Sequence, residues 1–433
     1  MKRIALAVSV VLLMVVQASA MDYGTGGYVY WNRSLDVSSY IAKQTLWKVE
    51  LDCAFTKVGS VANFDNVAMN NTYISWTTQV RNNSLEVYDP RDQGGQGTLL
   101  QVSIVNNTPP ASGYTGPNYD QPWDIIKVDP SKAPGSMQTN VCDGRLGTGY
   151  PNWSTQYLGR AMAAPNPWVP GTTPNSLSIA TLPNIWSNYV NALYDTNASG
   201  QIDNNAGEGQ LALYEYEVTP IDAEMGRNQA LYYSTGSSVR RMYLDGTGTG
   251  HSQVILSVGG TLGGKPNPVG SRSDGMGIAV GPGANPTVYL MACENGTGLD
   301  TVFGMRDLNG DNAIDDVRAV WQRGQLGITR LHDANINFYG EDVEYYQNPT
   351  TGKQFLFANG YSGNLFVLEL ADNGLLAVDG KYILGGNQEG PSWGQSGFEL
   401  DMNPGVIPEP GTMLLLSSGA LGVMGWMRRR RMK

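Results

Sequence analysis

Short stretches in which apolar and polar residues alternate recur along this chain, and each is bounded by glycine, proline or asparagine. The clearest group comprises residues 341–345, 354–358 and 364–370, with Asn-, Pro- and Gly-rich turns between them. A period of two residues predicts β-strands and excludes a helical solenoid. The pattern therefore indicates a repeated unit of about three short strands joined by turns.

Other segments resemble this unit, at uneven spacing. One copy comprises residues 277–280 and 287–291, others begin near residues 123–126 and 211–214, and a diverged copy precedes 72–76 and ends in 84–88. Residues 396–400 look like the first strand of a unit whose later strands are residues 27–31 and 34–37. Pairing of these N- and C-terminal strands would leave no exposed sheet edge.

The fold class predicted from this arrangement is all-β, as a β-propeller of about six or seven blades closed by its N- and C-terminal strands. The succession of an apolar strand, a Pro/Gly turn and a Leu/Val-Tyr strand resembles the NHL and YVTN propeller families. That resemblance implies fold rather than function. A β-sandwich or jelly roll is the alternative fold.

The N-terminal residues have the pattern of a secretory signal peptide. Lys2 and Arg3 precede the apolar residues 4–16, and Ala18 and Ala20 form an A-x-A cleavage site. We therefore expect residues 1–20 to be removed and residues 21–405 to form one extracytoplasmic domain.

The C-terminal residues 406–433 contain three ordered features. These are the triplet Pro408, Glu409 and Pro410, the uncharged apolar residues 411–427, and the arginines Arg428, Arg429, Arg430 and Arg431. A helix of this length barely spans a bilayer, and the arginines would stay in the cytoplasm. The prolines keep the junction extended and accessible.

This segment resembles the PEP-CTERM sorting signal of Gram-negative bacteria. The resemblance implies that a membrane exosortase is a partner and cleaves the chain, which is transiently anchored in the inner membrane and then reaches the cell surface or the medium. A tail anchor that is never cut is the alternative. Because PEP-CTERM proteins occur in bacteria that make exopolysaccharide, the resemblance also implies a polysaccharide partner.

Charge excludes one class of partner. Without its two ends the chain has 21 basic and 37 acidic residues, a net charge of −16. Such a surface repels nucleic acid, so no nucleic-acid partner is expected. The three cysteines, Cys53, Cys142 and Cys293, allow at most one disulfide, and the sequence leaves its pairing open.

Two loops carry oxygen ligands at the alternate positions that suit Ca²⁺, which prefers six to eight hard oxygen ligands. The predicted ligands are Asp307, Asn309, Asp311, the Ala313 carbonyl and Asp315 in one loop, and Asp195, Asn197, Ser199, Gln201 and Asp203 in a second. An isoleucine in each loop is expected to hold it to the core. Both loops resemble calcium loops of EF-hands and dockerins.

The resemblance fails at the twelfth position, where Arg318 and Ala206 replace the bidentate glutamate. Because the flanks of the first loop alternate like strands, the hairpin calcium loop of FG-GAP-type blades is the better analogy. We expect a structural calcium ion there; a polar turn without metal is the alternative.

Signals for catalysis are sparse. The sequence has two histidines, His251 and His332, and neither has a metal-ligand spacing; no P-loop or nucleophile elbow is present. The sequence therefore favours a non-enzymatic propeller that binds a ligand or glycan, or acts structurally, at the cell surface or in the matrix. The alternative is an extracytoplasmic propeller enzyme, such as a calcium-dependent sugar oxidoreductase, lyase or lactonase, that uses one of these histidines.

Overall fold

A computed structural model describes the β-rich core of the chain. The described residues are 27–38, 41–58, 62–63, 85–89, 98–103, 124–129, 131–132, 138–142, 176–177, 189–190, 193–194, 213–214, 220–226, 230–243, 252–270, 277–329, 340–348, 351–360, 364–384 and 397–403. Almost all of their regular structure is strand, and the single helical element among them is the 3₁₀ turn η3 (Gln325–Gly327). The predicted all-β class is confirmed.

Most strands belong to five antiparallel sheets, and four of these sheets contain four strands. Sheet A contains β27 (Gly397–Asn403), β1 (Gly27–Ser38), β2 (Ile41–Leu51) and β3 (Ala62–Asn63) in that order. Sheet B contains β4 (Leu85–Asp89), β5 (Thr98–Ser103), β6 (Asp124–Val128) and β7 (Gln138–Cys142). Sheet C contains β12 (Pro220–Met225), β13 (Ala230–Thr235), β14 (Ser238–Tyr243) and β15 (Gln253–Ser257).

The other two large sheets lie in the C-terminal half of the chain. Sheet D contains β20 (Val288–Glu294), β21 (Asp300–Arg306) and β22 (Asp316–Gln322), with β18 (Val269–Gly270) and β19 (Ile278–Val280) both paired to β20. Sheet E contains β23 (Gly340–Gln347), β24 (Gln354–Gly360), β25 (Leu365–Leu370) and β26 (Ala377–Leu384).

Three two-stranded ladders complete the described strands. They are β8 (Ser176–Leu177) with β10 (Leu193–Tyr194), β9 (Tyr189–Val190) with β11 (Leu213–Tyr214), and β16 (Thr261–Leu262) with β17 (Lys265–Pro266). None of the described residues forms a helix that is long and apolar enough to cross a membrane.

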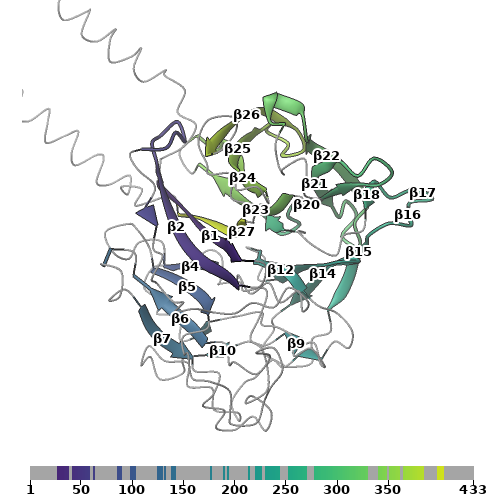
Figure 1. The fold of residues 1–433 in the computed structure, drawn as a ribbon. Helices are drawn as coiled ribbons and strands as arrows, with labels where there is room; N and C mark the ends of the chain where they lie inside the picture. Colours follow the sequence, from purple (N-terminus) through teal and green to yellow (C-terminus); the bar gives the residue numbers. More distant parts are fainter. Residues whose placement is uncertain are drawn as a thin grey trace, which may run out of the picture.

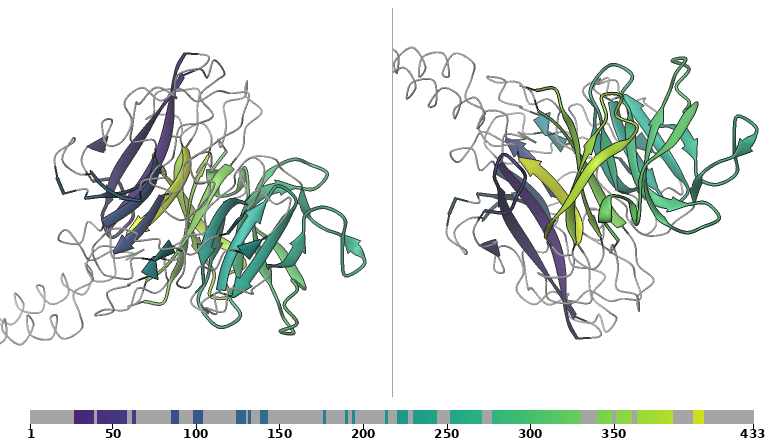
Figure 2. Two further views of the ribbon diagram at one scale, coloured as in Figure 1. Left: turned by 90° about the horizontal axis from the view of Figure 1, so that it is seen from below. Right: turned by 90° about the horizontal axis from the view of Figure 1, so that it is seen from above.

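The five sheets stand side by side in a curved row (Figure 1). Their inner strands make the contacts between neighbours, in the order β4, β27, β23, β19 and β12. Figure 2 shows the same succession from purple through yellow and green to teal.

The N- and C-terminal strands pair as expected. β27 lies antiparallel to β1, with Tyr28 opposite Asn403 and Trp31 opposite Leu400. The prediction separated residues 27–31 from 34–37, but both belong to one continuous strand, β1, which pairs along its length with β2.

The core consists of apolar layers between neighbouring sheets. One layer joins sheets C and D, a second joins D and E, and a third joins E and A. A strand between two such layers is buried on both faces, so six of the seven residues in β21 and in β24 are buried. This two-sided packing suppresses the alternation expected of a half-exposed strand.

The predicted units differ from the observed sheets in number of strands and in boundaries. Sheet E begins with the three expected strands, but β26 adds a fourth. The segments near residue 123 and residue 84 were predicted to start and to end a unit, respectively; instead β6 is the third strand of sheet B, and β4 is its first. These short apolar runs are equally suited to inner and outer positions, so the sequence misplaces the boundaries.

Candidate metal centre

The first predicted calcium loop joins β21 to β22, which pair as an antiparallel hairpin. Its path requires left-handed backbone at two residues, Gly310 with φ +77° and Asn312 with φ +73°. Glycine adopts this conformation without steric cost, and asparagine tolerates it better than most residues. The strand character expected of both flanks is confirmed.

Backbone amides fix the carboxylates of this loop. Asp307 accepts hydrogen bonds from the amides of Gly310 at 2.6 Å and Asn312 at 2.8 Å, one on each oxygen. The Asp311 carboxylate accepts from the amide of Ala313 at 2.9 Å, and that of Asp315 from Leu308 at 3.0 Å. These bonds hold the loop closed and leave one oxygen of Asp311 and one of Asp315 directed toward Asn309.

Three carboxylates converge in the centre of the loop. One oxygen each from Asp307, Asp311 and Asp315 lies within 4.8 Å of the others, and Asp311 and Asp315 are exposed to solvent. The Asn309 amide nitrogen donates to Asp311 at 3.2 Å and to Asp315 at 3.3 Å, so a partial positive charge lies between two anions. The arrangement suits a hard cation, because its charge would offset the repulsion among the carboxylates.

The side of the loop that faces the protein is anchored in the core. Ile314 is 5% exposed, belongs to the apolar layer between sheets C and D, and donates its amide to the Ile255 carbonyl at 2.9 Å. The expected role of this isoleucine is confirmed. At the twelfth position Arg318 forms an ion pair with Asp316 at 3.0 Å, so it neutralises a neighbouring carboxylate rather than the cluster.

Several predicted site residues lie outside the described residues. These are the signal-peptide residues Ala18 and Ala20, the second loop with Asp195, Asn197, Ser199, Gln201 and Asp203, and both histidines, His251 and His332. Cys53 is an exposed thiol, and neither it nor Cys293 takes part in a disulfide among the described residues.

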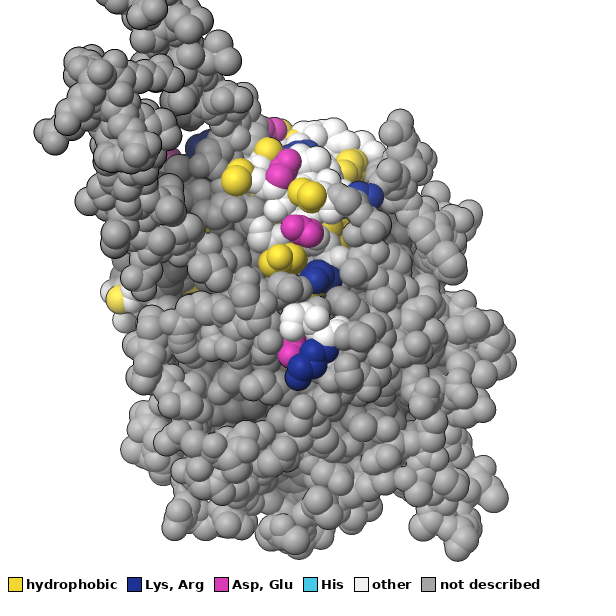
Figure 3. Space-filling view, turned by 90° about the vertical axis from the view of Figure 1, so that its left-hand side faces the viewer, with side chains coloured by type: hydrophobic (Ala, Val, Ile, Leu, Met, Phe, Trp, Pro, Cys, Tyr) yellow, Lys and Arg dark blue, Asp and Glu magenta, His cyan; other side chains and the backbone are white. Residues whose placement is uncertain are grey.

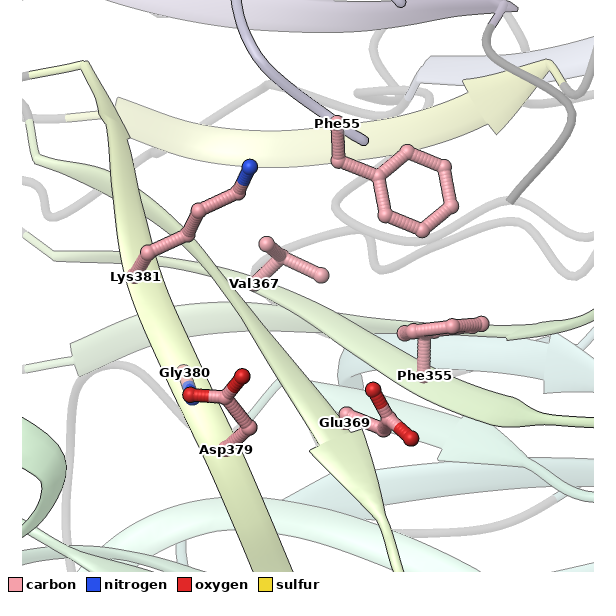
Figure 4. A pocket seen from close by; sticks show the side chains of 7 residues that line it. All are labelled: Phe55, Phe355, Val367, Glu369, Asp379, Gly380 and Lys381. Atoms are coloured by element: carbon pink, nitrogen blue, oxygen red, sulfur yellow. The ribbon is translucent and has the colours of Figure 1, made fainter. Parts of the chain in front are cut away.

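A small recess lies where sheets A and E meet. Phe55, Phe355 and Val367 line its apolar side, and Lys381, Asp379 and Glu369 line its polar side (Figure 4). Lys381 donates to the Ala54 carbonyl and to the Thr56 hydroxyl, while Glu369 pairs with Lys353 at 2.9 Å. Burial lowers the pKa of Lys381. Lys381 thus joins sheet E to the turn of sheet A, while the Glu369–Lys353 pair lies within sheet E, so the recess is a structural joint.

Phe55 is a structural residue that the sequence did not reveal. It is fully buried at φ +52°, within a turn that Asp52 closes by accepting from the amides of Ala54 and Thr56. A short polar turn with one phenylalanine gives no signal of this role, because the partners of the ring lie some 300 residues away in sequence.

One face of the molecule carries no large patch of one kind among its described residues (Figure 3). In Figure 3 the described acidic, basic and apolar side chains are interspersed, and none of the three kinds forms a continuous area there. Nothing on this described strip therefore favours a strongly charged or strongly apolar partner.

Comparisons with known proteins assign the C-terminal segment. A family profile described as the PEP-CTERM protein-sorting motif matches residues 406–431. The match contains the predicted sorting residues Pro408, Glu409, Pro410 and Arg428–Arg431, which lie outside the described residues. No curated protein matches the chain.

Two solved structures are similar at low level. A candidate 6-phosphogluconolactonase from Bacteroides uniformis is 10% identical, with a TM-score of 0.42, over 87% of this chain and 99% of its own. A protein of unknown function from Dyadobacter fermentans is 10% identical, with a TM-score of 0.31, over 84% and 85%. Likenesses this weak carry no argument about function.

The sorting motif therefore gives the clearest assignment. The chain is an exported, extracytoplasmic protein that an exosortase processes after transient anchoring in the membrane.

Proposed function

We propose that this protein acts at the cell surface or in the extracellular matrix as a non-enzymatic, ligand-binding or structural β-protein. The observation that carries the proposal is the sorting motif at residues 406–431, joined to a body built almost entirely of packed sheets. The expected ligand is an extracellular polysaccharide, which hydroxyl-binding side chains on loops between strands could recognise.

The test uses the host of the protein. Mass spectrometry of the mature protein, with and without the exosortase gene, should show loss of residues 428–433 only when the exosortase is present. Co-sedimentation with the purified exopolysaccharide of the host then tests binding. Retention of the arginines in the wild type would refute sorting, and no co-sedimentation would refute the glycan ligand.

The architecture proposed for the body is a β-propeller of about six or seven blades. Two observations support it. The five large sheets contact one another through their inner strands, and the N-terminal β1 pairs with the C-terminal β27. An experimental structure of the full chain tests the proposal, because a sandwich would have two sheets facing each other instead of a closed series.

The metal proposed for the loop between β21 and β22 is calcium, in a structural role. Convergence of Asp307, Asp311 and Asp315 supports it. The Ala313 carbonyl would add a ligand, and Asn309 would turn its amide so that oxygen rather than nitrogen faces the ion. The loop with Asp195, Asn197, Ser199, Gln201 and Asp203 is proposed as a weaker second site, because its serine replaces a carboxylate.

Asp311→Asn is a suitable variant to test this site. Asparagine keeps an oxygen that can accept from the Ala313 amide, so the turn survives while the negative charge is lost. Isothermal titration should show weaker calcium binding by this variant, while Asp316→Asn, a control on the same hairpin, should bind like the wild type. Equal calcium binding by all three proteins would refute the site.

A further inference from the structure

The C-terminal strand leaves sheet A at the end where the N-terminal strand begins. Tyr28 lies opposite Asn403, and Gly27 lies opposite Leu51, the last residue of β2. The turn of residues 52–57 follows directly and carries the exposed Cys53. The exit of β27 and this turn therefore lie at one end of the sheet.

The same end carries the turns of the neighbouring sheets. Phe55 in the turn of sheet A packs on Tyr346 and Phe355, which pair next to the connection from β23 to β24. That connection lies at the same end of sheet E as the turn of residues 371–376, because Gln354 pairs with Leu370. The connection of residues 371–376, between β25 and β26 of sheet E, contacts sheet D. There the Tyr289 hydroxyl donates to the Gly374 carbonyl at 3.0 Å, and Arg306 donates to the Asn373 carbonyl.

Arg306 is the last residue before the acidic loop, so loop 307–315 also lies at this end. The topology agrees with these contacts. In an antiparallel sheet, the connection from the first to the second strand and the connection from the third to the fourth lie at the same end of the strands. We call this end, which carries turn 52–57, turn 371–376 and loop 307–315, the exit end.

The sorting segment is tied closely to the exit end. Its match begins at residue 406, and β27 ends at Asn403. An extended chain spans at most about 17 Å from Asn403 to Pro408. A strand of seven residues is about 23 Å long, which exceeds the length of this tether. The opposite end of the sheets therefore lies farther from the start of the sorting segment than the exit end does.

We propose that the exit end faces the lipid headgroups while the sorting segment is anchored. This inference rests on the proposed sorting by the exosortase. The orientation does not require attraction between this surface and lipid, because the tether alone limits how far the exit end can move from the membrane. The orientation therefore comes from the short tether, and the connections at the other end of the sheets face away from the cell.

The test compares two single fluorescent labels on the full chain in phospholipid vesicles whose headgroups carry an acceptor dye. One protein keeps Cys53 and has Cys142→Ser and Cys293→Ser. The other also has Cys53→Ser and carries Thr297→Cys, at the exposed turn between β20 and β21. That turn leaves sheet D at the opposite end. Flotation of the same samples measures membrane anchoring.

With the native tether, the label at Cys53 should be quenched at least about twofold more than the label at residue 297, given the length of the strands. A Gly/Ser insertion of about 20 residues after Asn403 should bring the ratio close to one, because a flexible linker of that length lets the body rotate. Equal quenching in vesicles that float would overturn the orientation but not the sorting. Failure to float would overturn both.

Discussion

Replacement of Phe55 by alanine should strongly destabilise the joint between sheets A and E. The ring is fully buried, and it packs edge to face on Phe355 at 4.9 Å, Phe357 at 5.0 Å and Tyr346 at 6.0 Å between centroids. Each such aromatic pair contributes about 0.5–1.5 kcal/mol beyond the burial of area. Truncation of a buried phenylalanine to alanine costs about 3–5 kcal/mol, and we expect this range for Phe55→Ala.

The backbone at Phe55 allows a second, sharper comparison. At φ +52° every residue with a Cβ is strained, at a cost of roughly 1–2 kcal/mol, and glycine avoids that cost. Phe55→Gly should therefore be less destabilising than Phe55→Ala, although glycine in ordinary strand or helix positions is worse than alanine by about 0.5–1 kcal/mol.

Denaturant unfolding of the full chain measures both effects, with fluorescence as the signal. Val58→Ala is the control, because Val58 lies just after the same turn and is 43% exposed; it should stay within about 0.5 kcal/mol of the wild type. A loss of less than about 1 kcal/mol for Phe55→Ala would refute the role of the ring as an anchor. A larger loss for glycine than for alanine would refute the strain argument.

Three further predictions concern sheets D and E. Gly304→Ala should cost about 1–3 kcal/mol, because its Cβ would lie 2.8 Å from Leu375 and 2.9 Å from Val320; adding Leu375→Ala should cost less than the sum of the two changes, as urea titration would reveal. Tyr289→Phe should cost about 0.5–1.5 kcal/mol at pH 7, because it removes the hydrogen bond to the Gly374 carbonyl. Burial raises the pKa of Tyr289 above its ordinary value of 10, so the contribution of this tyrosine to stability is complete below pH 10 and is lost as the pH rises further. The melting temperature of the wild type should therefore approach that of Tyr289→Phe above pH 10. A difference between the two melting temperatures that stays constant with pH would contradict this. In Asp311→Asn, the rise in melting temperature that calcium should give the wild type, equivalent to about 2.7 kcal/mol at 100 times the dissociation constant, should shrink, whereas an unchanged rise would count against the loop.

The sequence predicted the strands of sheet E better than their grouping. Period-two alternation located β23, β24 and β25, but β26 reads Ala-Val-Asp-Gly-Lys-Tyr-Ile-Leu, and its glycine suggests a turn. In the structure Gly380 lies inside β26 rather than in a turn, and a Cβ there would lie 2.9 Å from the side chain of Leu368. Close packing between strands is a tertiary property, so local pattern does not reveal it.

The acidic loop was predictable because its chemistry is local. Oxygen-bearing residues at alternate positions, a glycine and an asparagine at the left-handed positions and an isoleucine toward the core all lie within ten residues. Phe55 was not predictable, because its conformation is imposed by aromatic partners from sheet E. The role of a side chain that packs against distant strands is decided by the fold.

The pairing of β1 with β27 affects how this protein is made. Ribosomes and the export machinery deliver β1 first and β27 last, so the second hydrogen-bonding edge of β1 has no native partner until almost the whole body has been translocated. Such long-range pairing slows folding and prolongs the exposure of an unpaired strand edge. The yield of this protein should therefore depend on extracytoplasmic chaperones that hold extended strands until β27 arrives.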